Sequence, residues 1–162
     1  MKLRFTPLFL ISWALGVAVP FNAAAQNGQV RIVYFSEPRC GYCERLKTLE
    51  IPEWQMRYGE QLRILEVDIS TSRGWDLFQS TIEFHALPRA GVPMMILDNH
   101  VLLGLTEILN RLDGMIAHYL TLDGTEWPPI PGLEELLAEL DEGVGTNIDS
   151  SNWANIKASF TE

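Results

Sequence analysis

The fold is decided by the stretch Val30-Arg31-Ile32-Val33-Tyr34-Phe35-Ser36-Glu37-Pro38-Arg39-Cys40-Gly41-Tyr42-Cys43, which holds the chain's only two cysteines. Its first six residues form a nearly continuous apolar run rich in β-branched side chains, which is typical of a strand covered on both faces. Pro38 ends this strand, and a helical pattern begins at about Gly41. The stretch therefore predicts a strand, a tight loop and a helix whose first turn carries a C-x-x-C motif.

The position of Cys40 and Cys43 at the start of a helix changes the chemistry of a thiol. The first backbone N–H groups of a helix have no intrahelical partner and the helix dipole is positive there, so both favour a thiolate. Cys40 is therefore the candidate nucleophile, and Cys43, one turn further on, is the candidate resolving thiol. A structural disulfide explains less, because a bridge across so short a loop constrains little of the unfolded chain.

The first 25 residues have the pattern of a signal peptide. Lys2 and Arg4 supply positive charge, residues 8–19 are largely apolar, and the alanines at positions 23–25 offer a cleavage site before Gln26. The alternative is an uncleaved N-terminal membrane anchor, because residues 5–21 are just long enough to span a bilayer. We expect cleavage and a soluble product in the periplasm or another compartment outside the cytoplasm.

Composition limits the classes of partner and ligand. The 162 residues include 12 basic and 21 acidic side chains, and the net charge of −9 argues against nucleic-acid binding. The length fits one domain with an appendage. The three histidines are dispersed, without the paired spacing of a zinc site, so we expect neither a metal nor a cofactor.

Downstream of the motif, the apolar pattern predicts the order βαβαββα within a domain spanning residues 26–122. Further strands are expected at residues 62–67, 94–97 and 101–103. Asp98-Asn99 lies between the last two strands, and this spacing indicates a tight β-hairpin. The remaining segments of the domain have the apolar periodicity of helices.

The first predicted helix starts at about Gly41. Cys43, Leu46 and Leu49 recur at helical spacing and are expected to face the core, whereas Lys47 is expected on the opposite side. Pro52 should break or kink this helix, because proline lacks the backbone N–H that a helix interior requires.

The two later helices have candidate N-caps. Ser70 or Ser72 is the predicted cap of one helix, in which Trp75 should pack into the core. Thr106 is the predicted cap of the last helix of the domain.

Residues 123–162 form a C-terminal extension. It comprises a proline-rich linker to residue 132, a short acidic amphipathic helix at residues 133–140 and a polar tail. One hypothesis is that the helix docks on its own domain, because so short a helix is marginal in water by itself. The other is a tether or partner-binding segment, for example for a membrane redox protein that recycles the dithiol.

The order of these features resembles the thioredoxin superfamily. A strand that runs into C-x-x-C at a helix start, and a later Val92-Pro93 that opens a β-hairpin before a final helix, match the family pattern across residues 30–120. The resemblance implies a thioredoxin-like α/β fold with a central mixed four-stranded sheet flanked by helices. It also implies that Cys40 attacks, that Cys43 resolves, and that Pro93 is cis and faces the disulfide.

The function implied by the resemblance is exchange of disulfides with other proteins. Gly41, Tyr42, Val92 and Pro93 are then the substrate-binding residues, because the backbone of Val92 can meet an extended substrate beside the sulfur atoms. The expected partners are proteins with a disulfide or a dithiol, and a membrane redox protein that recycles the pair; we expect the chain to act as a monomer. The competing hypothesis is a redox-inert carrier that holds a soft metal through its two cysteines.

Two departures from the family pattern concern proton transfer and redox potential. Tyr34 stands six residues before Cys40, where thioredoxin has a buried acid, and Arg39 precedes Cys40 in place of a tryptophan. Glu37, Glu66 or water are the alternatives for taking the proton of Cys43. The motif therefore predicts exchange without indicating the direction of electron flow.

Overall fold

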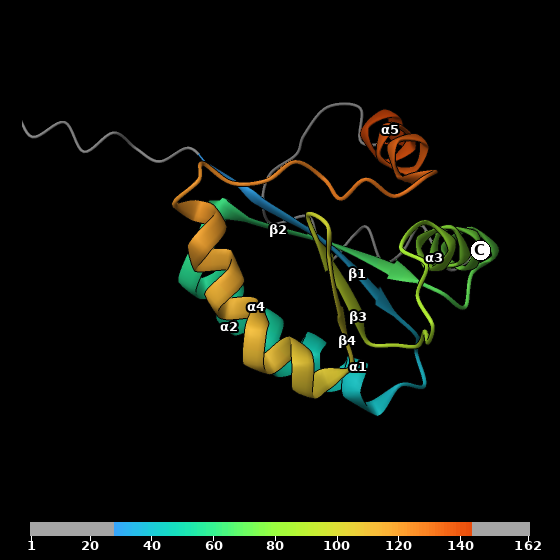
Figure 1. Ribbon diagram of the computed structural model, residues 1–162, viewed down its shortest axis with the longest axis horizontal. Helices are drawn as coiled ribbons and strands as arrows, with labels where there is room; N and C mark the ends of the chain where they lie inside the picture. Colours follow the sequence, from blue (N-terminus) through green and yellow to red (C-terminus); the bar gives the residue numbers. More distant parts are fainter. Residues whose placement is uncertain (1–27, 144–162) are drawn as a thin grey trace, which may run out of the picture.

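The computed structural model describes residues 28–143, in which a mixed four-stranded sheet lies between two helical layers (Figure 1). The spatial order is β2-β1-β3-β4. β1 and β2 are parallel, and the other two neighbouring pairs are antiparallel. The strands are β1 (Val30–Ser36), β2 (Leu62–Asp68), β3 (Met94–Leu97) and β4 (His100–Leu103). The α/β class and the order βαβαββα are confirmed; the predicted signal peptide and the tail beyond residue 143 lie outside the described residues.

Two apolar clusters lie on opposite faces of the sheet, because side chains alternate along β1. Ile32 and Tyr34 belong to the cluster on one face, and Val33 and Phe35 belong to the cluster on the other. Figure 1 shows the helices that cover the first face, which are α1 (Gly41–Arg45), α2 (Ile51–Tyr58) and α4 (Leu105–Leu120). The second face is covered by α3 (Ser72–Phe84) and α5 (Leu133–Gly143). Coverage of both faces explains the continuous apolar run of β1.

The helical run after the motif continues through the predicted break at Pro52. A π-helical turn, Leu46–Glu50, joins α1 to α2, and Pro52 lies in the first turn of α2. Proline is tolerated there, because the wider turn before it removes the need for its missing N–H. Leu49 lies within this wider turn and is 62% exposed instead of facing the core, and Ile51, just after the turn, is buried in its place.

The cap of α3 is Thr71, which corrects the prediction of Ser70 or Ser72. The Thr71 hydroxyl accepts a hydrogen bond from the backbone N–H of Gly74 at 3.0 Å, and it donates one to the Asp68 carbonyl at 2.9 Å. Thr71 also has the extended backbone conformation that an N-cap requires. This hydroxyl therefore joins the first turn of α3 to the end of β2.

Two further side chains differ from the predictions. Gly104, at φ 84°, precedes α4, so Thr106 lies inside the first turn and is not its cap. Trp75 is exposed at the rim of α3, and its ring centroid lies 5.8 Å from that of Phe78, which fills the core position.

Replacing Gly74 by Ala should destabilise the fold by about 1–3 kcal/mol. A Cβ atom at this position would lie only 2.0 Å from the Asp68 carbonyl oxygen, so α3 would have to move away from β2. Urea denaturation measures the loss. Gly114→Ala in α4 is the matched control, because a Cβ there meets no atom within 4 Å and alanine is the better helix former. Equal stability of the two variants would contradict the close contact.

The segment after α4 returns to the sheet. Gly124 forms a parallel bridge with Gln29, and the Thr125 hydroxyl accepts a hydrogen bond from the Arg31 backbone N–H at 2.9 Å. Further along, Ile130 and Leu133 are buried in the second apolar cluster. The amphipathic helix α5 therefore docks on its own domain, as the first of the two hypotheses expects. Within residues 28–143, no helix is both long enough and apolar enough to cross a bilayer.

Candidate active site

The two cysteines form a disulfide at the carboxyl end of β1. Their sulfur atoms are 2.08 Å apart. Between β1 and α1 the chain makes a short turn, in which the Cys40 N–H donates to the Glu37 carbonyl at 3.2 Å. The strand, loop and helix expected from the sequence thus place the disulfide just beyond the carboxyl end of a central strand, and Pro38 and Arg39 of the loop are exposed.

Cys40 is the N-cap residue of α1. Its backbone is extended, and its Sγ accepts a hydrogen bond from the Cys43 N–H at 3.0 Å. A side-chain acceptor in this position satisfies one of the unpaired N–H groups of the first turn. After reduction, the same N–H group and the helix dipole would stabilise a thiolate at Cys40, and the thiolate is the form that attacks disulfides.

The two sulfur-bearing residues differ in exposure. Cys43 is 0% exposed and belongs to the first apolar cluster, whereas Cys40 is only partly buried at the edge of that cluster. A disulfide on another protein can therefore reach Cys40 and not Cys43. This difference favours Cys40 as the attacking residue and Cys43 as the residue that resolves the bond from within.

Val92 and Pro93 lie at the same end of the sheet as the disulfide. β3 begins with Met94 opposite Phe35, so the residues before Met94 continue beside the loop that leads to Cys40. The Val92-Pro93 peptide bond is cis. The Pro93 carbonyl accepts a hydrogen bond from the Gly104 N–H at 2.8 Å, which joins this turn to the start of α4.

Gly41 and Tyr42 are exposed in the first turn of α1. The Tyr42 side chain is 65% exposed, and a Cβ added at Gly41 would meet no atom within 4 Å. Gly41 therefore leaves open space next to Cys40, which is itself partly buried. Gly41 and Tyr42 are thus accessible, whereas Val92 is partly buried and Pro93 is buried, and contact of these four residues with a substrate stays a prediction.

Tyr34 is buried beneath the helix and touches the motif. Its hydroxyl donates a hydrogen bond to the Cys43 carbonyl at 3.1 Å. Burial, followed by repulsion from the Glu66 and Glu44 carboxylates, raises the pKa of Tyr34 well above its ordinary value. The hydroxyl therefore stays protonated at neutral pH, where it holds the backbone of the motif as a donor.

A charged cluster lies near this tyrosine. The Glu66 Oε1 accepts a hydrogen bond from the Ser36 hydroxyl at 2.7 Å and lies 3.0 Å from the Lys47 Nζ. The Lys47 side chain is only 19% exposed, which contradicts the prediction that it lies on the side of the helix opposite the core. Lys47 follows Cys43 by four residues, and residues four apart share one side of a helix. The four-residue spacing between Cys43 and Lys47 was a signal that both side chains lie on one side of the helix, but sequence reasoning missed it.

The metal-carrier hypothesis requires further ligands. Both cysteine sulfurs are joined in the disulfide, and no group of three or more His, Cys, Asp or Glu side chains within residues 28–143 is arranged to hold a metal ion.

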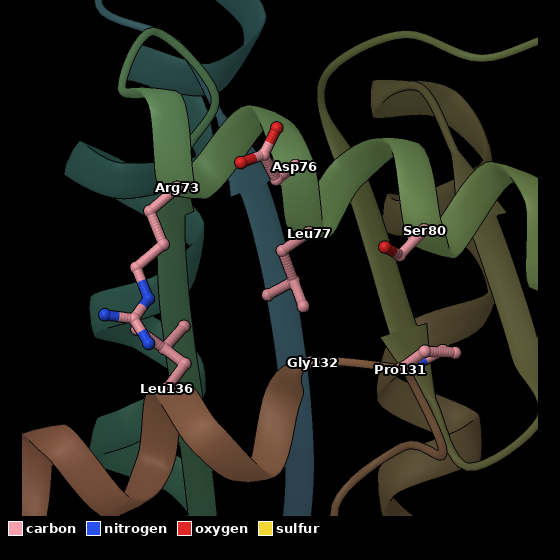
Figure 2. Close-up of a pocket in the computed structure, with 7 residues that line it drawn as sticks. All are labelled: Arg73, Asp76, Leu77, Ser80, Pro131, Gly132 and Leu136. Carbon is pink, nitrogen blue, oxygen red and sulfur yellow. The ribbon is translucent and has the colours of Figure 1, made fainter.

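A small pocket lies between α3 and the start of α5 (Figure 2), with a volume of about 120 Å³. Its lining consists of Arg73, Asp76, Leu77, Ser80, Pro131, Gly132 and Leu136, and therefore includes neither cysteine nor Pro93. Arg73 is already paired with the Glu139 carboxylate of α5. The pocket therefore lies where α3 and α5 meet, and none of its lining residues belongs to the disulfide site.

Comparisons with known proteins find similar solved structures. No family model and no curated protein matches the sequence. Solved structures that are similar to this chain include glutaredoxins and a thioredoxin. A buckwheat glutaredoxin, solved as its glutathione complex, is 21% identical with a TM-score of 0.42, and the match covers 58% of this chain and 79% of that one. The germline-specific thioredoxin Deadhead of Drosophila melanogaster is 17% identical with a TM-score of 0.40, covering 58% and 84%.

A third similar structure is glutaredoxin C1 from Populus tremula x tremuloides. It is 20% identical with a TM-score of 0.38, and the match covers 60% of this chain and 80% of that one. Likenesses of this size carry no information about activity.

Proposed function

We propose that this protein is an exported thiol-disulfide oxidoreductase that exchanges disulfides with other proteins through Cys40 and Cys43. The observation that carries the proposal is the asymmetry of the pair. Cys40 is partly exposed and caps a helix, while Cys43 is buried one turn further on. One thiol is thus accessible and stabilised as a thiolate, and the other is protected until a bond forms beside it. The leader pattern of residues 1–25 supports export.

The proposed reaction has two steps. The Cys40 thiolate attacks one sulfur of a substrate disulfide, which forms a mixed disulfide and releases the other substrate sulfur as a thiolate that takes up a proton. Cys43 then loses its proton and attacks the Cys40 Sγ, so that the intramolecular disulfide forms and the second substrate sulfur leaves as a thiolate. The substrate gains two electrons and the protein dithiol loses two. The same steps in reverse oxidise a substrate dithiol.

The substrate contacts we propose surround Cys40. An extended segment of the partner would lie along the backbone of Val92 beside Pro93, with Gly41 leaving room and the exposed ring of Tyr42 offering an apolar contact. The partners are proteins that carry a disulfide or a dithiol, together with a membrane redox protein that recycles the pair. We propose a monomer, because each chain carries both cysteines of the exchange.

The test measures redox state, exchange activity and metal content on one preparation of the protein. The protein is equilibrated with mixtures of reduced and oxidised glutathione, alkylated, and analysed by mass spectrometry. We expect a reversible two-electron couple, together with exchange of a disulfide-bonded peptide. A reduction potential of about −270 mV would indicate a reductant, and a reduction potential of about −120 mV would indicate an oxidant. Tightly bound stoichiometric metal without exchange would contradict the proposal and favour the carrier.

A further inference from the structure

The helical run from α1 to α2 carries two sets of apolar side chains. One set is buried in the first apolar cluster: Cys43, Leu46, Ile51 and Trp54. The other set is exposed, and we call it the apolar ridge: Tyr42, Leu49, Pro52 and Met56. Met56 is 84% exposed, and Tyr42 and Leu49 are both more than half exposed. Packing within the described part of the chain therefore does not account for these side chains.

The ridge is continuous along the surface of the helices. Leu49, Pro52 and Met56 are separated by three and four residues, and residues at these spacings are neighbours on one side of a helix. Tyr42 precedes Leu49 by about two helical turns. The ridge therefore begins in the first turn of α1, close to Cys40, and runs away from the disulfide along the helical layer seen in Figure 1. An exposed apolar patch with polar side chains around it typically marks a contact surface.

The charged side chains beside the ridge are paired with one another. Arg45 pairs with Glu50. Arg57 pairs with both Glu53 and Asp113. Neither guanidinium is therefore free to attract an acidic partner, and the ridge offers a partner mainly apolar contact. Leucine and methionine side chains are flexible, and methionine in particular suits surfaces that accept partners of varied sequence.

We propose that the apolar ridge is the docking surface for the segment that flanks the cysteine of a substrate protein, and that the substrates are polypeptides that have not yet folded. The inference rests on the proposed function, in which a substrate sulfur bonds to Cys40. A chain joined to Cys40 lies next to the first turn of α1, where the ridge begins. Because folding buries most large apolar side chains, a segment that can cover the ridge is available mainly before the substrate folds.

The length of the ridge determines which substrate residues can reach it. From Cys40 to Met56 the helical rise amounts to about 24 Å. An extended chain rises about 3.3 Å per residue, so about seven residues cover this length. We therefore expect good substrates to carry apolar side chains within about seven residues of the cysteine, on one side of it.

The experiment compares exchange of two peptides with the full chain. The peptides have the same length and one cysteine each, which is joined by a disulfide to the same fluorescent reporter. One peptide has leucine and phenylalanine beside the cysteine, and the other has serine at those positions. We expect the wild-type chain to prefer the apolar peptide. Leu49→Gln combined with Met56→Gln should lower kcat/KM for that peptide about tenfold, through KM rather than kcat, because the ridge binds the flanking segment and not the reacting sulfurs.

The matched control is Leu122→Gln. Leu122 is a leucine of nearly the same exposure as Leu49, at 61%, and it lies beyond the end of α4. This substitution removes an equally exposed apolar side chain away from the ridge, so kcat/KM for both peptides should stay unchanged. The loss caused by the double variant should also be much smaller for the serine peptide than for the apolar one.

Equal reaction of the wild-type chain and the double variant with the apolar peptide overturns the inference. Self-association of the wild-type chain in analytical ultracentrifugation, lost in the double variant, also overturns it, because a second copy would then cover the ridge. Should the double variant not fold, the wild-type chain still has to prefer the apolar peptide. Exchange of both peptides at equal rates removes this inference alone, whereas exchange of neither peptide contradicts the proposed function itself.

Discussion

Replacing Cys43 by Ala should leave the protein covalently trapped on its substrates, whereas replacing Cys40 by Ser should nearly abolish the trapping. The accessible sulfur makes the first bond, and only the buried thiol one turn further on can break it from within. Without Cys43 the mixed disulfide persists, and without Cys40 no external disulfide reaches a thiol. In both variants catalytic turnover should fall to the uncatalysed level.

For the measurement, exported proteins are isolated after acid quenching. Disulfide-linked species are then separated in the absence of a reductant. Mass spectrometry then identifies the protein joined to Cys40. The double variant, Cys40→Ser with Cys43→Ala, defines the background, and Gly114→Ala on an open stretch of α4 controls for the effect of substitution itself. Equal trapping by the two single variants would overturn the assigned order of attack and resolution.

Replacing Leu133 by Ala should lower the free energy of unfolding by about 2–5 kcal/mol. Leu133 is 1% exposed at the start of α5, and it packs in the second apolar cluster with Val33 and Phe35 of β1. The loss combines the transfer of the leucine side chain with the cavity left between the helix and the sheet. Because α5 and α3 cover this face together, the effect should approach that of a central core residue.

Chemical denaturation of the full chain measures this loss. Glu135→Ala is the matched control on the same helix, because this side chain is exposed, and its replacement should change stability by less than about 0.5 kcal/mol. Deleting residues 133–162 should cost more than Leu133→Ala alone, because it uncovers the face of the sheet. No loss of stability on deletion would contradict docking and would favour a tether.

The exposed contact between α5 and α3 should matter less than the buried leucine. The Arg73 guanidinium holds the Glu139 carboxylate through two nitrogens, yet both side chains are about half exposed. Such surface pairs contribute about 0–1 kcal/mol, because water screens the charges. Docking of the extension therefore rests on three of its own apolar side chains, which are buried in the second apolar cluster: Ile130, Leu133 and Leu136.

The motif and its place in the fold could be predicted, because each signal is local. The nearly continuous apolar run of β1, a proline that ends the strand, and two cysteines one helical turn apart are all properties of neighbouring residues. Two of the wrong predictions concern the direction of side chains on the helical run after the motif. Leu49 turns to solvent through a π-helical turn that relieves Pro52, and Lys47 turns inward because Glu66 lies opposite it on β2.

The sequence by itself therefore determined the order of strands and helices, the disulfide motif at a helix start, and the cysteine expected to attack. Only the tertiary structure decided which sulfur is accessible, that the Tyr34 hydroxyl holds the Cys43 carbonyl, and that α5 covers the sheet. The physical reason is distance along the chain. Periodicity and turn chemistry act within a few residues, whereas burial and ion pairing depend on the register of β1 against β2 and on segments that meet only when the chain has folded.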